Sequence, residues 1–219
     1  MLYLFDIDGT LVDTGGVGMK ALQEASLEVF GHEGPVLDLA GSTDLGIVAE
    51  IHAHFEVEST QESIERYFAA YLRRLDWNLQ NSDHSCRLLG GVVETLTALS
   101  GRSGIAMGLL TGNTEAGAAS KMRHFGLLEY FPFGAYGSDH PDRNLLGPIA
   151  IERAAAHSGR TFTGEEIWVI GDTPKDIACA KAIGAKCLAV ATGRFTANEL
   201  RAFHPDKVVD SLYDALEWL

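Results

Sequence analysis

The first ten residues, MLYLFDIDGT (residues 1–10), carry the strongest structural signal in this chain. Residues 1–5 are continuously apolar, which is typical of a strand that is buried on both faces of a sheet. Asp6 and Gly9 follow at once, so the expected strand ends in a short polar loop. Strands of this kind belong to parallel sheets whose two faces are covered by helices.

Further strands and helices alternate along the rest of the chain. The expected strands are apolar segments near 104–110, 133–136, 167–170, 186–191 and 207–209. Helical patterns lie between them, at about 114–125, 148–158, 174–184 and 196–202. This alternation predicts an α/β fold with a doubly wound parallel sheet.

One interval does not fit the alternation. From Asp6 to Gly104 the chain is much longer than the ~30 residues that a strand, helix, strand unit requires. Residues 15–86 contain no convincing strand, but they include three amphipathic stretches, at 17–30, 44–55 and 61–79. We therefore predict an inserted, all-helical cap at 15–86 and a catalytic core formed by residues 1–14 and 87–219.

Composition excludes several classes of partner. Of 219 residues, 46% are hydrophobic, and 17 Lys and Arg against 30 Asp and Glu give a net charge of -13. Such a charge opposes attraction to nucleic acid and to anionic membranes. Three irregularly spaced cysteines and a start unlike a signal peptide favour a cytoplasmic location. The sequence leaves the oligomeric state open between monomer and homodimer.

Polar loops follow three of the expected strands. Asp6 and Asp8 follow the first strand, residues 111–113 follow the second, and Asp172 and Asp176 follow the fourth. Because ligands bind beyond the carboxyl ends of parallel strands, we expect these loops to meet at one edge of the sheet. So many carboxylates in a partly dry cleft need a cation or raised pKa values. Mg²⁺, which binds carboxylates together with phosphate, is the expected cofactor.

These loops resemble the motifs of the haloacid dehalogenase superfamily of phosphohydrolases, in the branch similar to phosphoglycolate phosphatases. The first motif is DIDGTLV at 6–12, the second is LTGN at 110–113, and the fourth is GDTPKD at 171–176. The family usually offers a lysine as its third motif, often five residues ahead of a proline. This chain departs from that pattern with Arg143, which stands five residues before Pro148. The resemblance covers essentially the whole chain, since the family's smaller cap type is a helical insert after the first motif.

The resemblance implies a role for each acidic residue. Asp6 is the expected nucleophile, and Asp8 is the expected acid and then base. Mg²⁺ is expected on the Asp6 carboxylate, the Asp8 backbone carbonyl and Asp172, with Asp176 in support. Thr111 and Arg143 join Asp6 and Asp8 as catalytic residues. The residues expected to bind the phosphoryl group are Gly9, Thr10, Thr111, Gly112, Asn113 and Arg143.

Some of these residues have simpler readings. Thr111 and Asn113 also suit the start of the helix at 114–125 as capping residues. Lys121 and Lys175 are rival suppliers of positive charge for the third-motif role of Arg143. Three cap residues, Ser42, Thr43 and Asp44, either cap the next helix or, by the resemblance, point into the active site and select the substrate.

The sequence therefore predicts a Mg²⁺-dependent phosphatase that hydrolyses a small phosphorylated metabolite through an aspartyl phosphate. A phosphomutase similar to β-phosphoglucomutase uses the same motifs and stays open as an alternative. A receiver-type signalling module also clusters aspartates, threonine and a basic residue around Mg²⁺, but it has no place for the helical insert. A dehalogenase is disfavoured because those relatives lack the second aspartate, which is present here as Asp8.

Overall fold

A six-stranded sheet forms the centre of the larger part of the molecule in this computed structural model, which describes residues 1–81 and 86–216. All neighbouring strands run parallel. In order across the sheet they are β5 (Gly134–Ala135), β4 (Ala106–Leu110), β1 (Leu2–Phe5), β6 (Ile167–Gly171), β7 (Lys186–Val190) and β8 (Lys207–Val209). Every residue of β1 is buried, as expected for a strand inside a covered sheet.

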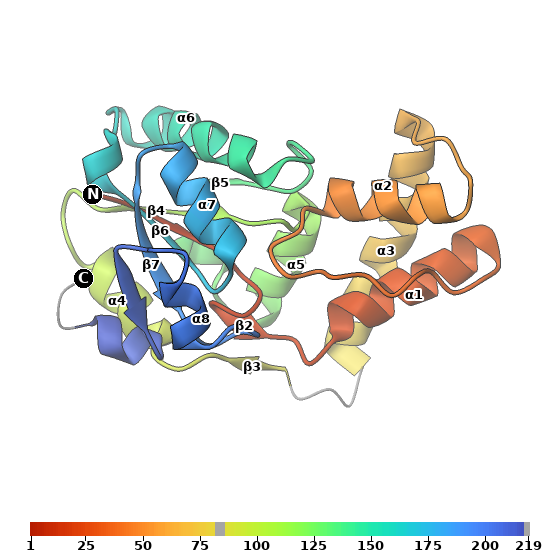
Figure 1. Ribbon diagram of the computed structural model, residues 1–219, viewed down its shortest axis with the longest axis horizontal. Helices are drawn as coiled ribbons and strands as arrows, with labels where there is room; N and C mark the ends of the chain where they lie inside the picture. Colours follow the sequence, from red (N-terminus) through yellow and green to blue (C-terminus); the bar gives the residue numbers. More distant parts are fainter. Residues whose placement is uncertain (82–85, 217–219) are drawn as a thin grey trace.

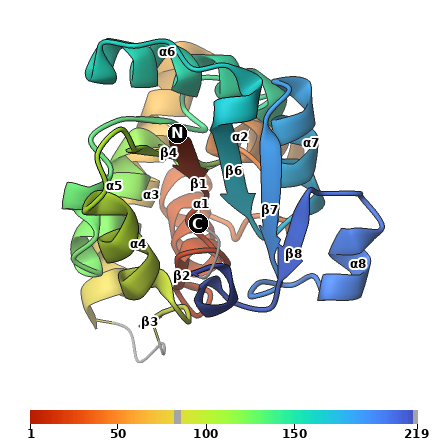
Figure 2. The ribbon, with the colours of Figure 1, turned by 90° about the vertical axis from the view of Figure 1, so that its left-hand side faces the viewer.

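Helices cover both faces of this sheet, because successive side chains of a strand point to opposite sides. Leu2 and Leu4 of β1 belong to the apolar cluster that includes α6 (Leu146–Ser158) and α7 (Pro174–Ala182). Tyr3 and Phe5 belong to the cluster on the other side, with α4 (Val92–Ser100) and α5 (Glu115–His124). Figure 2 shows the two layers on either side of the strands. The predicted doubly wound α/β fold is confirmed.

Four threonines define where helices begin. Thr43, Thr114, Thr173 and Thr196 each accept a hydrogen bond from a backbone N–H of the first helical turn. They start α2 (Asp44–His54), α5, α7 and α8 (Ala197–Arg201). Thr114 therefore caps α5, and the alternative prediction that Thr111 and Asn113 are its capping residues is wrong. The 3₁₀ turns are η1 (Leu128–Tyr130), η2 (Arg143–Leu145), η3 (Gly164–Glu166) and η4 (Leu212–Ala215).

The three amphipathic stretches form helices that pack together beside the sheet. They are α1 (Val17–Phe30), α2 and α3 (Gln61–Asn81), and we call them the helical cap. The cap has its own apolar core, in which Tyr67 and Leu75 of α3 are fully buried. Figure 1 shows it at one end of the molecule. The predicted boundary between cap and core adjoins residues 82–85, which lie outside the described residues, as do 217–219 of the predicted core, so this division stays a prediction.

Two features of the fold were not predicted. The helix α4 lies in the predicted core, where no helix was expected before residue 114, and it packs on the sheet. Two short strands, β2 (Val12–Asp13) and β3 (Arg87–Leu88), pair antiparallel outside the main sheet. Asp13 and Arg87 form an ion pair there, with 2.7 Å between carboxylate oxygen and guanidinium nitrogen. These strands tie together the segments that lead into the cap and out of it.

None of the helices in the described ranges is both long enough and apolar enough to span a bilayer.

Candidate active site

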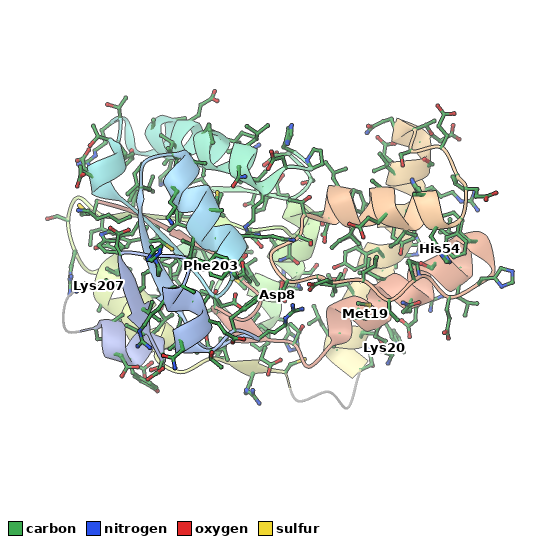
Figure 3. The ribbon with its side chains drawn as sticks, viewed as in Figure 1. Asp8, Met19, Lys20, His54, Phe203 and Lys207 are labelled. Carbon is green, nitrogen blue, oxygen red and sulfur yellow. The ribbon has the colours of Figure 1, made fainter. Side chains whose placement is uncertain are left out.

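The register of the sheet places three loops side by side. Phe5 of β1 pairs with Leu109 of β4 on one side and with Ile170 of β6 on the other. Asp6, the residue after Phe5, donates its backbone N–H to the Ile170 carbonyl over 2.8 Å. The loops that carry Thr111 and Asp172 therefore begin at the same edge of the sheet as Asp6. Figure 3 shows this edge, marked by Asp8, facing the helical cap.

Three carboxylates gather at this edge. Oxygen atoms of Asp6, Asp172 and Asp176 lie within 4.8 Å of one another, and all three residues are buried. Burial raises the pKa of Asp6 to about 6, and it raises that of Asp172 to about 8 with help from the charges of Asp176 and Asp6. The cluster therefore holds more negative charge than its surroundings compensate, and its hard oxygen donors fit a cation such as Mg²⁺.

Arg143 is the cation that the structure places inside this cluster. Its guanidinium lies 3.2 Å from Asp6 Oδ1, donates to Asp176 Oδ1, and reaches the Leu110 carbonyl over 3.3 Å. The side chain is 6% exposed, and its Nε has no partner among the described residues. η2 holds it at the start of α6. The rival Lys175 is elsewhere, because its Nζ contacts Ser42 Oγ of the cap segment at 2.8 Å.

Lys121 occupies a second buried position, beside Asp8. Its Nζ lies 2.6 and 2.7 Å from the two Asp8 carboxylate oxygens and 2.7 Å from Asn113 Oδ1. From the sequence, Lys121 is expected only as a rival to Arg143. The signal that could have located it is its place on α5, three residues after the buried Ala118, on a face that should otherwise be apolar.

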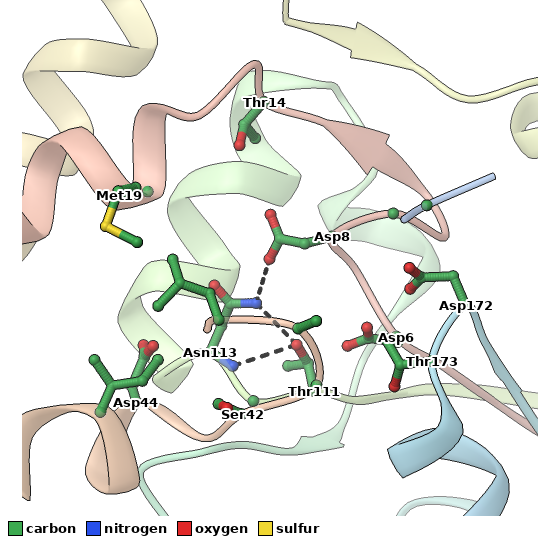
Figure 4. Close-up of a pocket in the computed structure, with 18 of the residues that line it drawn as sticks. Asp6, Asp8, Thr14, Met19, Ser42, Asp44, Thr111, Asn113, Asp172 and Thr173 are labelled. Carbon is green, nitrogen blue, oxygen red and sulfur yellow. Dashed lines mark hydrogen bonds between the residues drawn. The ribbon is translucent and has the colours of Figure 1, made fainter. Parts of the chain in front are cut away.

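The second-motif loop completes the network around Asp8. Asn113 Nδ2 donates to Asp8 Oδ2 over 2.8 Å and to Thr111 Oγ1 over 2.9 Å, and Figure 4 shows these bonds as dashed lines. In the described part of the chain, Thr111 Oγ1 only accepts hydrogen bonds. Its hydroxyl hydrogen is thus left to donate toward a bound oxygen atom.

The first-motif loop encloses Asp172. Thr10 Oγ1 donates to Asp172 Oδ1 over 3.1 Å. Gly9 has φ +79°, and a Cβ there would lie 2.4 Å from Asp172 Oδ2. Only glycine combines this backbone conformation with so close an approach. The DIDGT turn and Asp172 are therefore shaped to fit each other.

The cap segment around the predicted selecting residues docks onto the core. Asp44 donates its backbone N–H to the Gly112 carbonyl, and its carboxylate accepts the Thr114 N–H, both over 2.7 Å. Thr43 Oγ1 donates to the Pro141 carbonyl over 2.7 Å. A Cβ on Gly112 would lie 1.8 Å from the Ser42 carbonyl oxygen, so glycine is required for this contact. Burial raises the pKa of Asp44 to about 6.

A cavity of about 280 Å³ opens between the cap and the sheet edge. Ten of the predicted residues line it, namely Asp6, Asp8, Gly9, Ser42, Asp44, Thr111, Gly112, Asn113, Arg143 and Asp172. Thr10 and Asp176 do not line it, but they contact Asp172 and Arg143, which do. Thr43 does not line it either, and its hydroxyl contacts Pro141, which lies outside the lining. Lys121 lines it without having been predicted as a site residue.

Comparisons with known proteins establish the family. A model described as haloacid dehalogenase-like hydrolase matches residues 3–190, and the chain therefore belongs to this family. The chain is similar to Phosphoglycolate phosphatase 1 of Pseudomonas aeruginosa, with 26% identity over 98% of this chain and 78% of the relative. The predicted resemblance is confirmed, and the chain is a phosphatase of this family.

Solved structures share the fold. A putative haloacid dehalogenase-like hydrolase from Bacteroides fragilis superposes with a TM-score of 0.73 at 24% identity, covering 98% of both chains. CbbY from Rhodobacter sphaeroides, solved in complex with phosphate, gives a TM-score of 0.71 at 19% identity, covering 96% of this chain and 94% of CbbY. The core and the cap of this chain thus follow an arrangement found in known structures.

Proposed function

We propose that this phosphatase is Mg²⁺-dependent and hydrolyses a small phosphorylated metabolite through an aspartyl phosphate on Asp6. The observation that supports the proposal most is the position of Asp6, a buried carboxylate at the wall of a cavity, with Arg143 at 3.2 Å and two further buried aspartates beside it. A carboxylate attacks phosphorus well only when positive charge offsets the phosphoryl oxygens.

In this proposal, Asp6, the Asp8 backbone carbonyl and Asp172 would hold Mg²⁺. Asp176 would support these ligands without binding the ion, because both of its carboxylate oxygens already accept hydrogen bonds, from Arg143 and from Thr173. When bound, Mg²⁺ withdraws negative charge from the phosphoryl oxygens.

The reaction then proceeds in two displacements. An Asp6 oxygen bonds to phosphorus as the bond to the leaving alcohol breaks, and Asp8 gives its proton to that leaving oxygen. Asp8 next takes a proton from water, whose oxygen attacks phosphorus and breaks the Asp6 bond. Inorganic phosphate leaves, and Asp6 and Asp8 return to their starting states. In the structure Lys121 and Asn113 contact the unprotonated Asp8 carboxylate, which is the state that takes the proton from water.

Other groups next to Asp6 would bind the phosphoryl group. The Thr111 hydroxyl, the backbone near Gly112 and Asn113, and the Arg143 guanidinium surround the space next to Asp6. The N-terminus of the ten-residue helix α5 adds a favourable dipole, although the N–H groups of Thr114, Glu115 and Gly117 already donate to side chains. Donors placed in this way favour the charge of a phosphoryl group in the transition state.

The proposed partner is a small phosphate ester, and the net charge of -13 argues against nucleic acid and anionic membranes. The cysteines Cys86, Cys179 and Cys187 are all free, which supports a reducing compartment, the cytoplasm.

The product distinguishes the phosphatase from the phosphomutase. With Mg²⁺ and a sugar 1-phosphate or a small phosphate ester, we expect one free phosphate per ester consumed, because water is the proposed final acceptor. Phosphorus NMR of the mixture measures both free phosphate and any isomerised phosphate ester. A positional isomer formed without free phosphate would favour the phosphomutase. A stable phosphoprotein without turnover would favour the receiver-type module.

Mg²⁺ should stabilise the protein more at pH 8 than at pH 5. Because the folded-state pKa values of Asp6 and Asp172 are raised to about 6 and about 8, the metal-free folded protein binds more protons than the unfolded chain from about pH 4 to pH 8. Its stability therefore falls as the pH rises through that range. At pH 8, Mg²⁺ at 100 times its Kd should raise the free energy of unfolding by about 2.7 kcal/mol. The same Mg²⁺ concentration should raise it less at pH 5, because protons compete for the carboxylates.

Thermal unfolding with Mg²⁺ and with EDTA at both pH values measures this effect. Asp172→Asn should remove most of it, whereas Asp210→Asn, which removes an exposed carboxylate outside the cluster, should leave it unchanged. An equal Mg²⁺ effect in the Asp172 variant and the unchanged protein would contradict the proposed metal site.

A further inference from the structure

The end of the cavity that the helical cap contributes has no positive charge. Among the described residues that line the cavity, those from the cap and its adjoining loops include Met19, Leu22, Ile47, Tyr71 and Asp44, and none is Lys, Arg or His. Figure 4 shows Met19 and Asp44 on the cap side, across the cavity from Asp6 and Asp172. This end would surround the leaving group of a phosphate ester whose phosphorus lies next to Asp6.

Among the described residues of the cap helices that line the cavity, Asp44 and Tyr71 are the two with polar side chains. Asp44 is 7% exposed, and its Oδ2 accepts the Thr114 N–H. Tyr71 is 3% exposed and lines the cavity, and no described residue forms a hydrogen bond with its hydroxyl. Burial and the nearby charge of Asp44 raise the pKa of Tyr71, so this hydroxyl keeps its proton. This hydroxyl lines the cavity and has no partner among the described residues, so it is free to donate a hydrogen bond to a ligand there.

The cations that line the cavity are engaged elsewhere. Arg143 lies next to Asp6, and Lys121 forms its ion pair with Asp8, so both belong to the phosphoryl end, and the charge of Lys121 also acts on Asp44, whose pKa it lowers against the effect of burial. Arg194 pairs with Asp38 over 2.8 Å, and both side chains are exposed. A carboxylate on the leaving group would therefore enter an apolar surface beside the negative charge of Asp44. Desolvation and like-charge repulsion both oppose this arrangement.

On the basis of the proposed phosphatase function, we infer that the cavity selects a compact phosphate monoester whose leaving alcohol carries a hydroxyl or amine and no anionic group. The donor of that group binds the Asp44 carboxylate, and the Tyr71 hydroxyl binds the same end of the molecule. Met19 and Leu22 contact the carbon chain. A cavity of about 280 Å³ suits a small substrate. A leaving group with a carboxylate, such as glycolate, is rejected.

Three two-carbon esters test this inference at nearly constant size. They are 2-hydroxyethyl phosphate, phosphoethanolamine and 2-phosphoglycolate, which share the phosphorylated CH2 group and differ at the second carbon, which is a hydroxymethyl, an aminomethyl or a carboxylate group. We expect kcat/KM for at least one of the first two to exceed that for 2-phosphoglycolate on the order of 100-fold, because like charges in a desolvated site cost several kcal/mol. Phosphate release with Mg²⁺ measures all three.

Substitutions test whether Asp44 and Tyr71 are the residues that select the leaving group. Asp44→Asn keeps the shape of the side chain and an acceptor for the Thr114 N–H but removes the charge. The ratio of kcat/KM for the preferred ester to kcat/KM for 2-phosphoglycolate should therefore fall about tenfold or more. Tyr71→Phe should lower turnover of the preferred ester and leave that of 2-phosphoglycolate unchanged. Glu62→Gln, which removes an exposed charge of the cap outside the cavity, is the matched control and should not change the ratio.

The outcomes separate the two proposals. Turnover of 2-phosphoglycolate equal to or faster than that of the other esters would reject this inference and leave the proposed function intact. An unchanged ratio in Asp44→Asn would reject the role of Asp44. Release of no phosphate from these esters or from p-nitrophenyl phosphate would reject the proposed function and this inference with it.

Discussion

Asp6→Asn removes turnover almost completely, by at least about 10⁴-fold, while the protein stays folded. This is the expected result because the variant keeps the shape of the side chain but loses the nucleophile and one proposed metal ligand. The variant should also unfold at a higher temperature than the unchanged protein in EDTA at pH 8. It removes one of three buried carboxylates whose mutual repulsion destabilises the metal-free fold.

Steady-state phosphate release and thermal unfolding test this pair of effects together. Asp13→Asn is the control, since Asp13 follows the same motif but pairs with Arg87 outside the cluster. It should keep most of its activity. Substantial turnover by Asp6→Asn, or a lower unfolding temperature than the unchanged protein in EDTA, would exclude the role we give to Asp6.

Arg143→Ala should weaken both catalysis and folding. It leaves Asp6, Asp172 and Asp176 without their cation, and removal of one partner from a buried ion pair costs about 3–5 kcal/mol. For a chain of this length that loss lowers the unfolding temperature by about 6–20 °C. The kcat/KM should fall as well, because a bound phosphoryl group loses a charged donor.

Arg143→Lys separates charge from geometry. It should restore most of the stability and only part of the activity, since an ammonium replaces the charge but not the planar guanidinium that reaches both Asp6 and Asp176. Lys175→Ala is the control for loss of a nearby exposed cation. Unchanged kcat/KM in Arg143→Ala, together with a collapse in Lys121→Ala or Lys175→Ala, would move the third-motif role away from Arg143.

The sheet could be predicted from the sequence because its strands are short, buried and bounded by polar turns. Segments 1–5, 167–170 and 207–209 each became a strand at nearly the expected positions. The helix α4 lies within the predicted core but was missed, because periodicity does not assign a short stretch of nine mostly apolar residues to a helix or a strand. The pairing of β2 with β3 was missed because two-residue strands have no pattern of their own.

The candidate site was predictable where residues follow strands directly. The backbone of β1 and β6 carries Asp6 and Asp172 to the same edge, so their meeting follows from parallel pairing alone. Lys121 was not predictable in this way. It reaches Asp8 from a helix, and its contact depends on how α5 is rotated against the sheet. The number of residues between Asn113 and Lys121 does not predict how the helix is rotated.

The sequence by itself determined the family, the order along the chain of the six strands of the main sheet and the presence of a helical insert, and it predicted the four acidic residues Asp6, Asp8, Asp172 and Asp176 at one edge of the sheet. These depend on local properties, namely burial periodicity and short motifs within a single loop. Only the tertiary structure decided that Arg143 rather than Lys175 stands beside Asp6, and that Asp44 and Tyr71 face the cavity from the cap. Those contacts join residues far apart in the chain, and their geometry is set by the packing of the cap on the core, which no local pattern encodes.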